Sequence, residues 1–316
     1  MIDVVEGVLR VLIVLTGFLV LPLMVGQLEH KAMAHMQSRV GPMYAGGFHG
    51  WAQLVADAVK FAQKEEVVPA AADRTVFRLA PSIALLPYFI AMLAIPIGPE
   101  LVGQRLDIGL FFVLAVMGVG VLGTLMGGWA SANKFSLLGG IRQAAQLMAY
   151  ELPFVLAAAS VATAAGTLSL VGIVVAWQPW WLLWQLPAAV VFFVAGLAEL
   201  SRGPFDMPVA ESEIIFGPLT EYTGLRFALF LLAEYAGIVV LCLLTSVLFL
   251  GGWNGPVFDS FVWTLLKAGA LAFVVIWLRV SYPRMREDQL QRLAWQVLIP
   301  VALAQLFVTG LVKVIM

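Results

Sequence analysis

The sequence predicts an all-α integral membrane protein, with eight transmembrane helices and a short amphipathic helix at the membrane surface. Its composition is the first observation behind this prediction: 62% of the 316 residues are hydrophobic and 12% are charged, whereas soluble domains carry roughly 25% charged residues. The second is the repeated occurrence of apolar runs long enough to cross about 30 Å of hydrocarbon. We treat residues 1–316 as one membrane domain.

Eight apolar runs define the predicted spans in chain order. The first lacks a basic lead-in and an A-x-A site, so it is expected to be a retained helix and not a signal peptide. The fifth begins among four tryptophans, which is typical of an aromatic belt at a membrane face. The spans are 4–28, 82–102, 108–125, 137–164, 180–200, 225–250, 261–278 and 293–315.

The connection at 29–81 contains apolar side chains at helical spacing, among them Phe48, Trp51, Leu54 and Phe61. This spacing predicts an amphipathic helix at 50–64 that lies in the membrane interface. Two roles fit such a helix. It is either a simple surface anchor or a lip around an opening through which a lipophilic molecule enters.

Basic residues are distributed unequally between the two sides. The connections after the first, third, fifth and seventh spans, with the helix ends next to them, hold fourteen of the 18 Lys and Arg residues. Cytoplasmic loops carry an excess of such residues. We therefore expect 29–81 and 199–225 to be cytoplasmic loops, and both termini to lie outside. The other side retains Arg10, Arg105, Lys267 and Lys313.

Carboxylates are concentrated around the loop at 199–225. Ionisable groups at membrane depth are costly, so they are found mainly where they line a polar path. Glu151 and Glu234 lie within predicted spans and Glu199 lies at the end of one, so we expect these three acids to line such a path. In the loop itself, clustering raises carboxyl pKa values, so these acids can hold and pass protons near neutral pH. The alternative is that they pair with nearby arginines or cap helices. The loop acids are Asp206, Glu211, Glu213 and Glu221.

Cofactor chemistry is not expected from this chain alone. Cys242 is the single cysteine, so neither a disulfide nor an iron–sulfur cluster is expected. His30 and His35 are five residues apart, which does not place two ligands on one helical face. We expect no metal site, and any redox cofactor would come from a partner.

Eight ordered stretches resemble one family, the H subunit of the proton-pumping NADH-quinone oxidoreductase (respiratory complex I), whose mitochondrial counterpart is NADH dehydrogenase subunit 1. They include EHKAMAHMQSRVGP at 29–42 and AELSRGPFDMPVAESE at 198–213. The other stretches are 54–65, 72–81, 127–151, 220–235, 248–253 and 278–295.

The resemblance implies a membrane-arm subunit that forms part of the quinone chamber and begins the acidic path that couples quinone reduction to proton pumping. The helix at 50–64 would then lie at the quinone entrance. By motif, the acidic path would comprise Glu151, Glu199, Glu211, Glu213, Glu221 and Glu234. The quinone-binding residues would be Glu29, His30, Arg39, Phe48, Trp51, Phe205 and Asp206.

The resemblance also implies partners. This chain would hold no electron carrier; quinone (ubiquinone or menaquinone) would be the substrate, and flavin and iron–sulfur clusters would lie in other subunits. An iron–sulfur subunit near the chamber and neighbouring membrane-arm subunits are expected in the cell inner membrane, with no nucleic acid. Two rival interpretations are a membrane anchor of an energy-converting hydrogenase and a stand-alone proton-coupled transporter.

Several positions depart from the family pattern. His30 replaces the usual Arg, which points to a weaker or pH-dependent basic contact near the entrance. Val209 replaces a common Glu, so one loop acid is missing. These changes lie in loops that face the partner subunits or the chamber by the resemblance, so the donor module and the quinone type both stay open. The remaining departures are Met43, Tyr44, Leu200, Ser201, Gly217 and Pro218.

Overall fold

The computed structural model describes residues 2–256 and 258–315, without the side chains of residues 2–6, 8, 211 and 212, and its regular elements in these ranges are all helical. The long helices are α1 (Ile2–Met36), α3 (Arg74–Ala94), α4 (Gly109–Ala130), α5 (Lys134–Ala165), α10 (Gly224–Phe249), α11 (Phe261–Ser281) and α13 (Ile299–Ile315). The shorter helices are α2 (Gln53–Gln63), α6 (Leu170–Ala176), α7 (Trp181–Trp184), α8 (Leu186–Glu199), α9 (Glu211–Ile214) and α12 (Glu287–Arg292).

The prediction of eight full-length spans is confirmed for seven of them. In the described residues, seven helices are long and apolar enough to cross a membrane, the last being Glu287–Ile315, in which α12 and α13 are joined by a π-helical segment, Leu293–Leu298. The predicted span at 180–200 instead divides at Gln185 into α7 and the 14-residue α8. Pro187 explains the division, because proline lacks a backbone N–H and favours the first turn of a new helix.

The second predicted span is also displaced, from 82–102 to Arg74–Ala94. The Asp73 side chain caps this helix by accepting hydrogen bonds from the backbone of Thr75 and Val76 at 3.1 and 3.3 Å. The helix ends before Ile95, which precedes a proline and is therefore biased toward extended backbone. The apolar run continues to Val102, but only its first part is helical.

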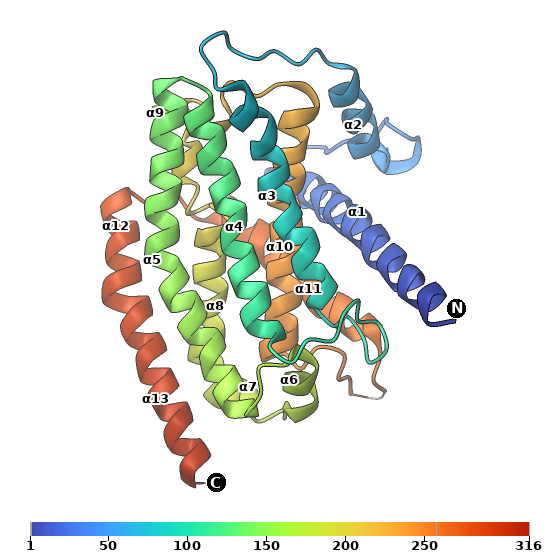
Figure 1. The fold of residues 1–316 in the computed structure, drawn as a ribbon, viewed down its shortest axis with the longest axis vertical. Coiled ribbons are helices and arrows are strands. Elements are labelled where there is room, and N and C mark those ends of the chain that lie inside the picture. The colour runs from blue at the N-terminus through green and yellow to red at the C-terminus, as the bar shows by residue number, and fades with distance from the viewer. Residues whose placement is uncertain (1, 257, 316) are drawn as a thin grey trace.

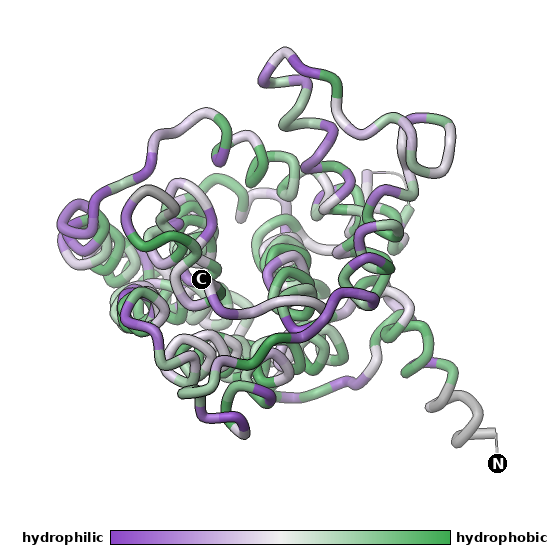
Figure 2. Tube along the Cα trace, turned by 90° about the horizontal axis from the view of Figure 1, so that it is seen from above, coloured by the Kyte–Doolittle hydropathy of each residue, from purple (hydrophilic) through white to green (hydrophobic). Residues whose placement is uncertain are grey.

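The bundle is centred on α5, which packs against α4, α8 and α13, while α10 packs against α3, α8 and α11 (Figure 1). Small residues allow close approach, since a Cβ on Gly123 of α4 would overlap the backbone of Ala84 of α3. Helix α1 contacts α10 and α11, then diverges from the bundle toward its N-terminal end. Viewed from above, the bundle helices contain many hydrophobic residues (Figure 2).

The segment between α8 and α10 is irregular but packed into the bundle. Leu200, Arg202, Phe205, Met207 and Ala210 are all buried. Non-helical backbone at membrane depth is tolerated where protein surrounds it. The segment therefore continues from the short α8 toward the end of the bundle at which α2 and α9 lie (Figure 1).

Lys267 of α11 binds the C-terminal end of α10 and the turn that follows it. Its ammonium group donates to the carbonyls of Leu250, Gly252 and Asn254 at 2.7, 2.7 and 2.8 Å. The last carbonyls of a helix have no partner within the helix, and a cation there is also favoured by the helix dipole. All three donors of this lysine are satisfied by its own chain.

We expect Lys267→Met to lower the free energy of unfolding by about 3 kcal/mol, because a partly buried cluster of three carbonyls loses a charged donor. The measurement is the thermal midpoint of the purified complex. Lys134→Met is the matched control, since Lys134 is exposed and begins α5, where a cation gains nothing from the dipole. Equal midpoints for the two variants would contradict the fastening role.

Candidate functional site

A buried arginine, Arg202, pairs with carboxylates from two helices at one end of the bundle. It is 2% exposed, and its guanidinium lies 3.2 Å from Oε1 of Glu29 in α1 and 2.9 Å from Oε1 of Glu234 in α10. Glu29 is equally buried and also pairs with Arg279 of α11. The guanidinium of Arg202 lies 4.9 Å from the ring centroid of Tyr235, a favourable cation–π arrangement. We call Glu29, Arg202, Glu234 and Arg279 the ion cluster.

The charges of the ion cluster balance, with two carboxylates and two guanidinium groups. Burial by itself lowers the pKa of Arg202, but the negative charges of Glu234 and Glu29 outweigh it, so the pKa is raised. Arg202 is therefore a permanent cation. Removing one partner from such a buried pair leaves an uncompensated charge, which costs far more than the pair contributes.

Next to the ion cluster, a small cavity of about 70 Å³ lies between α3, α4, α8 and α10. Polar groups from Tyr88, Gln143, Glu199, Ser201 and Glu234 line it. Glu199 is buried, and its Oε2 and the Ser201 hydroxyl have no hydrogen-bond partner among the described residues. A cavity of this size, lined by unsatisfied polar groups, is suited to ordered water. Glu234 belongs to both this cavity and the ion cluster.

Glu151 lies on the outside of α5, against α4. Its Oε1 is 3.5 Å from the position that a Cβ on Gly118 would take. The side chains beside it on α5, Met148 and Leu152, are exposed and apolar. A carboxyl in such a setting is costly against lipid and is expected to face protein or a polar path.

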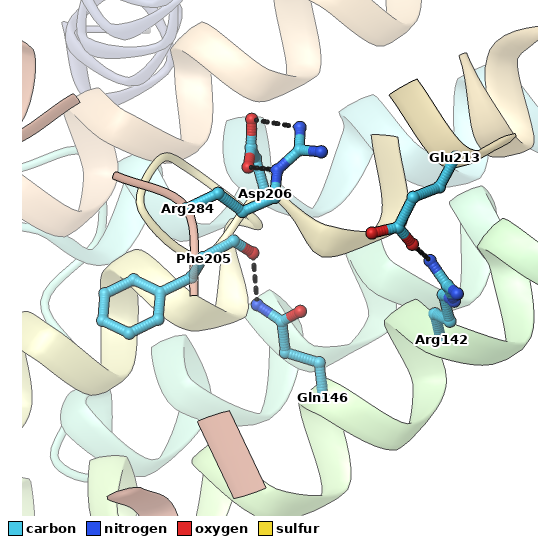
Figure 3. A network of polar contacts seen from close by, with 6 residues as sticks. All are labelled: Arg142, Gln146, Phe205, Asp206, Glu213 and Arg284. Atoms are coloured by element: carbon cyan, nitrogen blue, oxygen red, sulfur yellow. Dashed lines mark hydrogen bonds and ion pairs between the residues drawn. The ribbon is translucent and has the colours of Figure 1, made fainter. Parts of the chain in front are cut away.

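The loop acids are paired with bases or amides rather than with one another. The guanidinium of Arg142 lies 2.7 Å from Glu213, and that of Arg284 lies 2.7 and 3.1 Å from the two oxygens of Asp206 (Figure 3). Glu221 accepts a hydrogen bond of 2.6 Å from Asn133. The side chain of Glu211 lies outside the described part of the chain. The pairing alternative from the sequence thus fits these loop acids.

Gln146 of α5 holds the buried loop in place. Its amide nitrogen donates to the carbonyls of Ala198 and Phe205 at 2.6 and 2.9 Å, and Figure 3 shows it reaching the Phe205 carbonyl. The Phe205 ring packs at 5.9 Å from that of Tyr150. A single side chain therefore bridges the end of α8 and the start of the acid-rich segment.

A large apolar groove of about 760 Å³ opens between α1, α2, α10 and α11. Its lining includes Met24, Leu54, Leu243 and Gly269, with Lys31 and Trp51 toward one end. Helix α2 is held beside α10 by the rings of Phe61 and Phe227, 5.8 Å apart. The groove is of the size and character of a site for an elongated apolar ligand.

Nearly the whole chain matches known proteins. A family model described as NADH dehydrogenase matches residues 9–310. The NADH-quinone oxidoreductase H subunit of Bacillus cytotoxicus is 45% identical over 290 residues, which cover 90% of this chain and 87% of the relative. The H subunits of Bacillus cereus (strain B4264) and Bacillus thuringiensis (strain Al Hakam) match with the same identity and coverage. The chain belongs to the family of NADH-quinone oxidoreductase H subunits. The resemblance of its eight stretches is thereby confirmed.

The structure places the residues that the family resemblance assigns to quinone binding in several settings. Trp51 lines the groove, and Glu29 lies in the ion cluster. His30 is partly buried, and its Nδ1 has no partner in the described chain. Phe205 and Asp206 lie in the segment between α8 and α10. Arg39 and Phe48 are exposed and are not among the groove-lining residues, and Phe48 is 82% exposed. Binding by these residues stays a prediction.

Sequence reasoning missed several residues of the site. Tyr88 lies within a predicted apolar span, and only its hydroxyl group could have indicated a polar role. Gln143 and Gln146 carried a similar signal as amides within the fourth span. Arg279 was counted only as a cytoplasmic charge, because its pairing with Glu29 joins residues 250 positions apart and local spacing contains no trace of it.

We expect Arg202→Met to lower the free energy of unfolding by roughly 3–5 kcal/mol, since Glu29 and Glu234 lose a buried partner. The double variant Arg202→Met/Glu234→Gln is expected to lose less than the sum of the single variants. Thermal midpoints of the purified complex give both comparisons.

Arg286→Met is the control, because its pair with Asp288 is exposed and such pairs contribute under about 1 kcal/mol. If the double variant instead loses as much stability as the sum of the two single variants, Arg202 and Glu234 do not interact.

Proposed function

We propose that this chain forms part of the quinone chamber of a proton-translocating NADH-quinone oxidoreductase and begins its acidic coupling path. The observation that supports this most strongly is the position of the ion cluster at one end of the apolar groove. On α10 and α11 the groove-lining residues are followed, in the direction of the loop end of the bundle, by Glu234 and Arg279, and on α1 Glu29 lies between the groove-lining residues Leu28 and Lys31.

The groove suits a quinone because both have a long apolar part and a polar end. An isoprenoid tail is apolar and would lie along α1 and α11, while the polar headgroup would move toward Lys31 and the ion cluster. Trp51 of the α2 region lies at the groove and is 66% exposed, which favours the interpretation of this helix as an entrance lip over that of a simple anchor.

The acidic path would begin where the ion cluster meets the small cavity. Glu234 touches both, and Glu199 lines the cavity with an unsatisfied oxygen. A change of charge at the quinone headgroup would alter the balance of the ion cluster, and the cavity acids would respond by taking up or releasing a proton. Glu151 would carry the change toward the outer face of α5.

Electrons would come from a partner, because the single cysteine of this chain, Cys242, cannot hold an iron–sulfur cluster by itself. An iron–sulfur subunit would adjoin the chamber at the loop end, and a flavin subunit would lie beyond it. Neighbouring membrane-arm subunits would cover the face of α5 that exposes Glu151. In this arrangement the connections between α1 and α3 and between α8 and α10 are cytoplasmic, and both termini lie on the outer side of the cell inner membrane.

We expect Gly269→Phe to raise the KM for a long-tailed quinone by about tenfold, because the new ring enters the groove. A Cβ at Gly269 meets no atom within 4 Å, so the substitution fills space without displacing backbone. The measurement is the NADH:quinone activity of membranes, compared with that for a short-tailed quinone, which needs less of the groove.

Ala270→Phe is the matched control, since Ala270 is exposed on the same helix and does not line the groove. An unchanged KM in Gly269→Phe, or an equal rise in both variants, would rule out the groove as the route.

We expect Glu199→Gln and Glu151→Gln to abolish quinone-coupled proton pumping in assembled membranes, because an amide cannot carry the proton. Acidification is measured per quinone reduced. Glu100→Gln serves as the control, since Glu100 is exposed and pairs with Arg105 at 3.9 Å, away from the proposed path. Pumping at the wild-type level in either path variant would refute the relay.

A further inference from the structure

A second cavity, of about 450 Å³, lies at the end of the bundle opposite the ion cluster. It is formed where α5 ends, where α6 and α7 connect, and where the last turn of α13 lies. Figure 1 shows these ends gathered at the bottom of the bundle. Its lining includes Gln178, Trp180, Trp181, Trp184 and Lys313, and no carboxylate of the described chain belongs to it.

Three tryptophans give this cavity a rigid aromatic wall. The rings of Trp180 and Trp184 stack with centroids 5.4 Å apart, and Trp181 meets Trp184 edge-on at 6.4 Å. Tryptophan gathers at the level of lipid headgroups, where its ring is apolar and its N–H finds polar partners. The wall therefore places the cavity at headgroup depth.

Lys313 supplies a positive charge that no carboxylate of the described residues neutralises. Its ammonium donates one hydrogen bond, of 3.1 Å, to the Ala164 carbonyl at the end of α5, and no carboxylate of the described residues pairs with it. An ammonium has three donors, so two remain. Two other basic residues on this side differ: Lys267 is satisfied by three carbonyls, and Arg105 pairs with Glu100.

Gln178 adds a neutral donor at the rim. Its side-chain oxygen accepts a 2.5 Å hydrogen bond from Trp180, while its amide nitrogen has no acceptor within the described part of the chain. The cavity thus presents unused N–H donors and one positive charge, with no acid from residues 2–256 and 258–315 in its lining. Oxygen atoms of an anion are the natural complement of such a set.

We propose that this cavity binds the phosphodiester headgroup of an anionic phospholipid in the outer leaflet, with Lys313 on the phosphate and the tryptophan wall against the glycerol and upper acyl chains. The site is separate from the quinone groove and does not depend on it. Its occupant is a lipid, because the cavity combines phosphate-binding donors with an aromatic surface at the ends of membrane-spanning helices.

The test uses the purified, delipidated complex with added phosphatidylglycerol, and native mass spectrometry counts the lipids retained. We expect Lys313→Gln to retain one phosphatidylglycerol fewer and to need about tenfold more lipid for equal occupancy, as for the loss of one charge-assisted contact. Lys313→Arg should restore retention. Phosphatidylcholine, whose phosphate charge is balanced by its own choline cation, and inorganic phosphate, which has no acyl chains to meet the tryptophan wall, are titrated in parallel, and neither should distinguish the variants.

Arg105→Gln is the control for a general loss of charge on this side and should retain as much phosphatidylglycerol as the wild type. Equal retention by wild type and Lys313→Gln would overturn the proposal. So would a disulfide between Val312→Cys and a cysteine of a neighbouring subunit in the assembled complex, because the cavity would then be covered by protein.

Discussion

The buried guanidinium of Arg202 is the interaction on which the arrangement at the loop end of the bundle depends. It is 2% exposed and is held between carboxylates from α1 and α10, and a charge at such a depth is stable only while both partners remain. Because Arg279 of α11 shares Glu29 with it, one cluster connects three helices with the irregular segment that follows α8. The need to keep these four charges together therefore constrains the positions of the three helices at the loop end.

The same constraint accounts for the groove. Helix α1 is fastened at Glu29 and diverges from the bundle toward its N-terminal end (Figure 1), so apolar faces of α1, α10 and α11 border a space that α2 partly covers. Glu234 then connects this region with the cavity that contains Glu199. In our proposal, Glu234 therefore belongs both to the ion cluster that faces the quinone and to the acids that form the proton path.

Much of the fold could be predicted from the sequence where a long apolar run coincides with a helix, as for α10, whose bounds Gly224–Phe249 differ by one residue from the predicted 225–250. Predictions failed where backbone chemistry interrupts such a run, at Pro187 in the fifth span and at Ile95 in the second. The depth of Glu234 could be inferred from its place in an apolar run. Its pairing with Arg202 could not, because contacts between distant segments leave no local pattern, and neither could the contact of Glu29 with Arg202 across 173 positions.

The most direct test of the central claim locates the two ends of a bound quinone in the assembled complex. One analogue carries a photoreactive group on its headgroup and another carries it on the far end of its tail, and the labelled peptides of this chain are mapped. We expect headgroup labelling near the ion cluster, at 25–31 and 227–235, and tail labelling at 265–272 of α11. Reversed labelling, or no labelling of any of these segments, would contradict the proposed orientation of the quinone.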